Sequence, residues 1–235
     1  MSSQSLTNTN PTVLDPTVAQ PRTTRTPRGW AWVGVVAGVA SIASIQLSMA
    51  AGPVYGPVAP TPESITRDLA DRIPQLLAFH LTTMVAALLL LVFAAGLKRR
   101  LDAQAPAGSL LPSLAGTGLV IVSVMQILGA GLDTEFIFGL NQPEKLITSD
   151  VSFYSHWIAT IPWVWVTAGI SAVAVGLAAL RGAAPKWLGI VSLVLGALTV
   201  LVGASPLQYL AGFVGPLWLL VAALAFALGD RRSRS

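Results

Sequence analysis

Charged side chains are missing from long stretches of this chain, and that absence limits its possible folds more than any other feature. Between residues 30 and 228, apolar stretches are interrupted only by short polar loops. Lys, Arg, Asp and Glu make up 10% of the residues, against about 25% in an ordinary soluble domain. The mean hydropathy is +0.70. This pattern indicates a multi-pass membrane protein.

Six stretches are long and apolar enough to cross a membrane as helices. A helix needs about 20 mostly apolar residues to span a hydrocarbon core of about 30 Å. The sequence therefore predicts an all-α polytopic membrane helix bundle with six transmembrane helices. The predicted spans cover residues 30–51, 75–97, 110–132, 156–180, 187–205 and 209–229.

The charges divide unevenly between the two sides that six crossings create. Eleven of the 14 Lys and Arg residues fall on the side that carries both chain ends, and seven of the 10 acidic residues fall on the other side. Because cytoplasmic loops are enriched in Lys and Arg, the pattern predicts that both termini are cytoplasmic. The excess of Lys and Arg behind the net charge of +4 lies at the cytoplasmic edges of the spans, where these residues contact anionic head groups of the lipid bilayer. We expect no nucleic-acid partner, because no basic domain is present.

Composition divides the chain into one membrane domain and two tails. Residues 1–28 are rich in Ser, Thr, Asn and Pro without an apolar period, which predicts a disordered cytoplasmic tail. Residues 29–230 form the predicted six-helix domain, and residues 231–235 form a basic cytoplasmic tail. The sequence has no Cys, which excludes disulfides, thiol nucleophiles and Cys-ligated metals.

The loop between the first two spans, about residues 52–74, carries the signals of a short helix. Thr61 suits the N-cap, Pro62 suits the first helical position, and Glu63 follows at the positive end of the helix dipole. Ile65 and Leu69 begin an apolar stripe with four-residue spacing. We expect this helix to lie on the outer membrane surface or to cap the bundle.

Polar side chains at membrane depth gather in the half of the bundle that lies away from the termini. His80 lies 18 residues, about 27 Å of helix rise, from Lys98 at the cytoplasmic edge. Polar groups inside a membrane usually face the bundle interior or a wet cavity. We therefore predict an outward-facing polar pocket that contains His80, His156, Gln46, Gln126, Asp133 and Glu135.

Three functions are compatible with such a pocket. The first is the binding or sensing of a small ligand or partner membrane protein, without a cofactor and without enzymatic activity, because no acidic residue falls inside a span. The second is a membrane redox protein in which His80 and His156 hold a haem or a divalent metal. The third is a small transporter, because the stretches that run from His80 to Gly96 and from His156 to Gly176 open two similar hairpins.

Small residues recur on two of the predicted spans, and a proline interrupts a third. Without water to drive association, membrane helices meet where small residues let their backbones approach closely. Such stripes favour helix contacts within the chain, with self-association as the alternative. Pro162 predicts a kink or a loosened turn early in the fourth span. The stripes consist of Gly34 and Gly38 in the first span and of Gly189, Gly196 and Gly203 in the fifth.

The last third of the chain resembles a known kind of protein. The stretch from Arg181 through Pro185-Lys186-Trp187-Leu188-Gly189, followed by a Gly-rich helix and by Pro216-Leu217-Trp218, carries the resemblance. Residues 156–229 are in this respect similar to a broad group of uncharacterised multi-pass membrane proteins from high-GC bacteria. The resemblance implies a multi-pass protein of the bacterial plasma membrane, which is the cell inner membrane, and it implies no catalytic activity.

Overall fold

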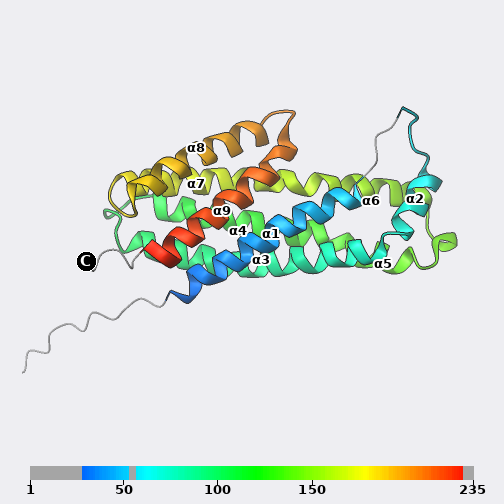
Figure 1. Ribbon diagram of the computed structural model, residues 1–235, viewed down its shortest axis with the longest axis horizontal. Coiled ribbons are helices and arrows are strands. Elements are labelled where there is room, and N and C mark those ends of the chain that lie inside the picture. The colour runs from blue at the N-terminus through cyan, green and yellow to red at the C-terminus, as the bar shows by residue number, and fades with distance from the viewer. Residues whose placement is uncertain (1–27, 53–56, 230–235) are drawn as a thin grey trace, which may run out of the picture.

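The computed structural model describes residues 28–52 and 57–229, and within them the chain is helical with no strand. Six helical spans are long and apolar enough to cross a membrane, which confirms the predicted all-α bundle (Figure 1). The chain is thus a multi-pass membrane protein. The predicted tails, 1–28 and 231–235, lie outside the described residues except for Arg28.

Three spans are single helices, and three contain a 3₁₀ segment. The first, second and fifth spans are α1 (Gly29–Ala51), α3 (Ile73–Asp102) and α8 (Lys186–Gly203). The third span combines α4 (Leu111–Gly129), the 3₁₀ helix η1 (Ala130–Leu132) and α5 (Asp133–Gly139). The fourth combines α6 (Thr148–Thr160), the 3₁₀ helix η3 (Ile161–Trp165) and α7 (Val166–Leu180). The sixth joins η4 (Gln208–Leu210) to α9 (Ala211–Leu228).

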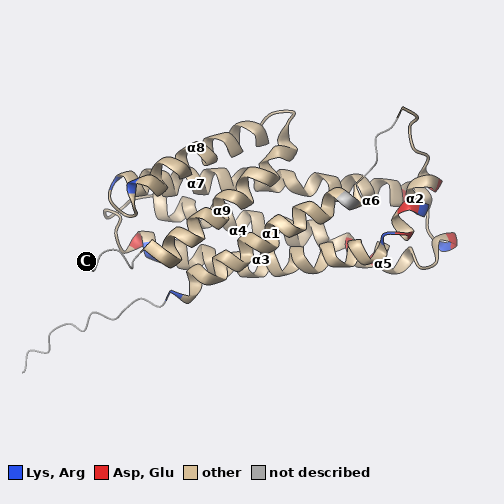
Figure 2. Ribbon diagram, viewed as in Figure 1, with Lys and Arg blue, Asp and Glu red and all other residues tan. Residues whose placement is uncertain are grey.

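The start of α1 and the end of α9 lie at the same end of the bundle, which we call the terminal end (Figure 1). Lys, Arg, Asp and Glu of the described chain gather toward the two ends of the molecule, and the middle of the bundle is nearly free of them (Figure 2). This separation matches the cost of placing charges at membrane depth. The basic residues described at the terminal end are Arg28, Lys98, Arg99, Arg100, Arg181 and Lys186.

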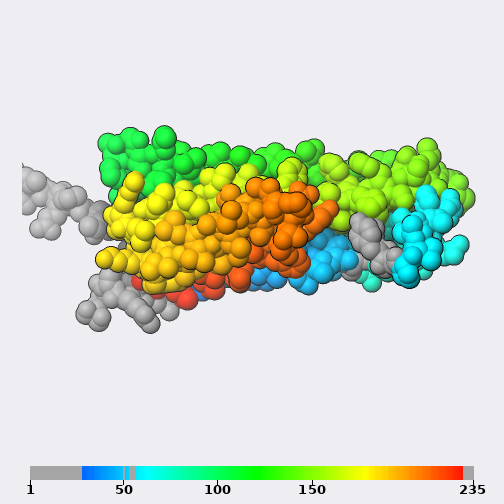
Figure 3. Space-filling view, turned by 90° about the horizontal axis from the view of Figure 1, so that it is seen from above, coloured from blue at the N-terminus to red at the C-terminus, as the bar shows by residue number. Residues whose placement is uncertain are grey.

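Small residues set the helix contacts inside the bundle. α8 lies along α7 in the space-filling view (Figure 3), and its Gly189, Gly196 and Gly203 all face α7. Gly34 faces the ring of Phe93 on α3, and Gly38 faces the backbone of α9. The structure therefore uses both glycine stripes for contacts within the chain, as the sequence favoured.

The two hairpins that the sequence suggested as copies pack differently at their matched glycines. Gly96 at the end of α3 lies against the side chain of Trp30 on α1. Gly176 near the end of α7 lies against Leu193 and the backbone carbonyl of Gly189, both on α8. Gly96 therefore contacts a helix from outside its hairpin, whereas Gly176 contacts the other helix of its own hairpin.

The helices that lie away from the terminal end extend further than the hydropathy pattern predicted. The third span continues to residue 139 and the fourth begins at 148, whereas the expected limits were 132 and 156. These extensions, together with α2 (Pro62–Ala70), the 3₁₀ helix η2 (Pro143–Lys145) and the start of α3, form a unit that we call the headpiece (Figure 1). The extensions are helical because the headpiece has an apolar core of its own, which includes Leu76, Phe79, Phe136 and Ile158.

The short helix α2 begins as the sequence predicted. Thr61 is its N-cap, and the Thr61 hydroxyl accepts a hydrogen bond from the backbone N–H of Ser64 at 3.3 Å. Pro62 is the first helical residue and Glu63 lies in the first turn. The buried side chains of Ile65 and Leu69 belong to the headpiece core, and α2 packs on α6, so this helix caps the bundle (Figure 3).

The exposed apolar side chains show where the membrane belt ends. On α3, large exposed apolar residues run from Leu77 to Val92, and on α4 they run from Leu114 to Leu128. From Leu77 to Lys98 the helix rises about 31 Å, which is the thickness of a hydrocarbon core. Helix length therefore places the boundary between the membrane belt and the headpiece near Leu77 and Leu128, and the headpiece itself also exposes Phe138, Ile147 and Phe153.

Candidate functional site

Three polar side chains from three helices meet at this boundary. The imidazole Nδ1 of His80 on α3 lies 3.1 Å from Oδ2 of Asp133, the first residue of α5. The phenol of Tyr154 on α6 donates a hydrogen bond of 2.9 Å to Oδ1 of the same carboxylate. We call His80, Asp133 and Tyr154 the latch cluster, because it ties α3, α5 and α6 together.

Asp133 is the centre of the latch cluster and is completely buried. A buried carboxylate is costly unless its oxygens are hydrogen-bonded, and here each oxygen has one partner. Tyr154 is also completely buried, and its ring stacks on Phe136 with a centroid distance of 4.4 Å and an interplanar angle of 12°. The cluster therefore continues directly into the apolar core of the headpiece.

The His80 side chain contacts the cluster through Nδ1 and is partly exposed at the protein surface. Its side chain is 24% exposed, whereas that of Asp133 is not exposed. When Nδ1–H donates to the carboxylate, this bond fixes the tautomer and leaves Nε2 as an acceptor. Within the described residues, Nε2 of His80 has no protein partner.

The structure brings together only His80 and Asp133 of the six residues that the sequence proposed for a pocket. Gln126 is buried one helical turn before the end of α4, and its Oε1 has no hydrogen-bond partner within the described residues. Gln46, Glu135 and His156 have exposed side chains. These three point away from the bundle interior, so the six residues do not line one vestibule.

Tyr154 belongs to the cluster although the sequence analysis did not select it. The buried residues of α6 are Val151, Tyr154, Ser155 and Ile158, a spacing of three and four that defines one helical face. That periodicity was the available signal, since it turns Tyr154 inward and His156 outward. His156, two residues later, is exposed and shares no interaction with His80. Within the described residues, no group of three or more His, Asp or Glu is placed to hold a metal ion.

A layer of polar groups lies next to the latch cluster, on the membrane side. The hydroxyls of Ser44 on α1 and Thr83 on α3 are hydrogen-bonded at 2.6 Å. Ser123 on α4 donates to the carbonyl of Ala87 at 2.7 Å. In addition, Trp157 on α6 donates from Nε1 to the carbonyl of Gly129 at 2.8 Å, which joins the fourth span to the third.

Two hollows lie on the headpiece. The larger, which we call the headpiece groove, has a volume of about 290 Å³ and runs between α2 and the η2–α6 segment. This volume is close to the lower limit for small-molecule sites, about 300 Å³. The groove is lined by Glu63, Thr66, Arg67, Ala70, Asp71, Pro143 and Thr148.

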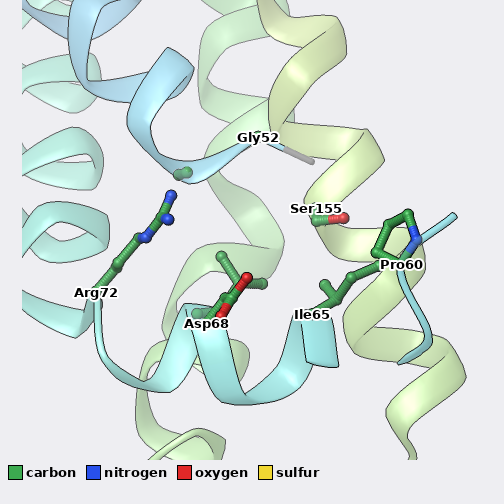
Figure 4. A pocket seen from close by; sticks show the side chains of 8 residues that line it. Gly52, Pro60, Ile65, Asp68, Arg72 and Ser155 are labelled. Carbon is green, nitrogen blue, oxygen red and sulfur yellow. The ribbon is translucent and has the colours of Figure 1, made fainter. Parts of the chain in front are cut away.

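The smaller hollow lies between the end of α1, α2 and α6, and it has a volume of about 30 Å³ (Figure 4). This is about the space that one water molecule occupies. Figure 4 shows Arg72 reaching from the beginning of α3 toward the end of α1 beside Gly52. This hollow is therefore part of the packing of the headpiece.

The headpiece groove has a defined electrostatic character. The backbone N–H at the start of α2 lowers the pKa of Glu63, and hydrogen bonds from Thr61 and Thr148 act in the same direction. Glu63 is therefore a carboxylate at neutral pH. With Asp71 and the guanidinium of Arg67, the groove presents groups of both charges.

Comparison of the chain with known protein families, with curated proteins and with solved structures finds no match.

Proposed function

We propose that this protein is a receptor without enzymatic activity in a bacterial plasma membrane. Its termini lie in the cytoplasm and its headpiece lies outside, because the terminal end carries the excess of Lys and Arg. The ligand binds in the headpiece groove, which is built from two separate segments, α2 and the η2–α6 segment. That groove is the single observation that carries the proposal.

The lining of the groove defines the class of ligand. Arg67 can bind a carboxylate, while Glu63 and Asp71 can bind an amine. Few large apolar side chains line the hollow, so an apolar ligand would gain little from entering it. We infer that the ligand is a small zwitterion, such as an amino acid or a dipeptide, or the end of a peptide.

The orientation can be tested with single cysteines, because the sequence contains none. Ser149 in the headpiece and Arg99 at the terminal end are both exposed. We expect a membrane-impermeant maleimide to label Ser149→Cys in intact cells and to label Arg99→Cys only after the cells are permeabilised. Labelling in the reverse order would place the headpiece in the cytoplasm and contradict the proposal.

Ligand binding can be tested by thermal unfolding of the purified full-length protein with free amino acids and dipeptides as probes. A ligand that binds only the folded state raises the unfolding midpoint. We expect at least one probe to raise it, and we expect Arg67→Ala to remove the rise. Arg99→Ala, a matched change at the terminal end, should leave the rise intact. The proposal fails if no probe stabilises the protein or if the rise persists in Arg67→Ala.

A further inference from the structure

The apolar interior of the protein is divided into two clusters, and the division lies at the level of the latch cluster. One cluster fills the membrane bundle and includes Leu90, Trp165 and Trp218. The other fills the headpiece and includes Phe79 and Ile161. Residues 161 and 165 are the two ends of η3, so this short segment passes from one core to the other.

The second, third and fourth spans are the longest, and two of them, the third and the fourth, lose regular α-helical geometry at the same level. Ala130 and Leu132 in η1 have ψ angles of −2° and −16°. Thr160, just before η3, and Trp165, its last residue, have ψ angles of −16° and −8°. Pro162 explains the second interruption, because it lacks a backbone N–H. Interruptions of this kind often mark hinges. They adjoin in space, since a side chain added at Gly129 would meet Ile161.

The groups around these interruptions are polar and incompletely paired. Gln126 Oε1 and Trp165 Nε1 are buried without a hydrogen-bond partner in the described chain. A polar layer between two apolar cores holds them together less strongly than continuous apolar packing would.

We propose that the hairpin α5–η2–α6 swings on the membrane bundle about η1 and η3. The latch cluster, the apolar contacts of Leu76 and Phe79 of α3, and the Trp157–Gly129 hydrogen bond hold it in the closed position. The second span, α3, runs without interruption from 73 to 102 and is the fixed post, the element against which the hairpin moves. His80 belongs to this post, whereas Asp133 and Tyr154 belong to the hairpin. Opening therefore separates Asp133 from His80 and the apolar side chains of the hairpin from Leu76 and Phe79, and it leaves the Asp133–Tyr154 bond inside the hairpin.

The swing would regulate the proposed receptor. This regulatory role rests on the proposed function, whereas the motion itself does not. α2 packs on α6, and the headpiece groove lies between α2 and the η2–α6 segment. A ligand that bridges the two walls of the groove favours one position of the hairpin. A change in the position of the hairpin is transmitted through η1 to α4 and through η3 to α7, which lie in the membrane.

The test measures distances between pairs of spin labels on the full-length protein in lipid bilayers, without any ligand. One pair joins Glu144 on the hairpin to Ala204 at the end of α8, and reports the swing. A second pair, Phe138 and Asp150, lies within the hairpin, and a third, Arg181 and Ala204, lies within the bundle. All five positions are exposed, and the absence of native Cys permits specific labelling.

We expect Asp133→Asn to widen the Glu144–Ala204 distribution at least twofold and to leave the other two pairs unchanged. His80→Ala, which alters a partly exposed side chain, should produce the same pattern if Asp133→Asn does not fold. Three narrow distributions in both variants would overturn the proposal. Widening of the pair within the hairpin would also overturn it, because the hairpin would then be unfolding.

A second change should reverse the effect. Gly131 lies in η1 and has open space where a side chain would be added, so Gly131→Ala favours helix without a clash. We expect this change to reduce the extra width of the Glu144–Ala204 distribution in Asp133→Asn, because Ala favours helical geometry in η1 more than Gly does. Gly29→Ala, at an equally open position far from the hinge, is the matched control and should change nothing. Because no ligand is involved, these results are independent of the proposed binding site.

Discussion

Replacing Asp133 with Ala should lower the free energy of unfolding by about 3 kcal/mol, because a buried hydrogen-bonded group is removed and its partner is left behind. Asp133 is completely buried and holds His80 at 3.1 Å and Tyr154 at 2.9 Å. In the variant, the buried Tyr154 hydroxyl has no acceptor. The measurement is equilibrium unfolding of the purified protein in mixed micelles, followed by tryptophan fluorescence.

Two further variants separate the contributions within the latch cluster. Tyr154→Phe removes only the hydroxyl but leaves Oδ1 of the buried Asp133 without its partner, and we expect a loss of about 2 kcal/mol. Glu135→Ala removes an exposed carboxylate two residues from Asp133 and should leave stability unchanged. If Glu135→Ala and Asp133→Ala destabilise the protein equally, the burial and bonding of Asp133 do not carry the effect.

Replacing Gly196 with Leu should be strongly damaging to the membrane bundle, with a loss of about 3 kcal/mol or failure to fold. A side chain at this position would begin 2.8 Å from the Ala172 methyl group and 2.9 Å from the carbonyl oxygen of Gly169. The carbonyl belongs to the backbone of α7, so a rotamer change cannot relieve the contact. α8 would have to move away from α7 as a unit.

The neighbouring position gives a matched control for Gly196→Leu. Ala197 is exposed on the same helix, so Ala197→Leu adds a similar side chain toward lipid and should leave the unfolding transition unchanged. The measurement is the thermal midpoint in detergent, with size-exclusion chromatography to detect association. Normal stability in Gly196→Leu would mean that the close contact between α7 and α8 is not required for the fold.

Hydropathy and local capping signals determined much of this fold from the sequence. The six spans follow from apolar length alone, since each helix satisfies its own backbone and needs no distant partner to be recognised. The N-cap at Thr61 is equally local, because its acceptor and its donor are three residues apart. The glycine stripe on α8 also predicted a close helix contact, although its partner α7 was known only from the structure.

The headpiece and the latch cluster were decided by the tertiary structure. The hydropathy pattern predicts that the third span ends at residue 132, because polar residues follow, but the helix continues where Phe136 and Ile137 enter a second core. The same pattern groups His80 with His156, because both lie at similar depth. Depth along a helix is readable from residue number, whereas the direction of a side chain depends on the rotation of each helix against its neighbours. That rotation, fixed by packing among α3, α5 and α6, selected Asp133 and Tyr154 as the partners of the cluster and turned His156 outward.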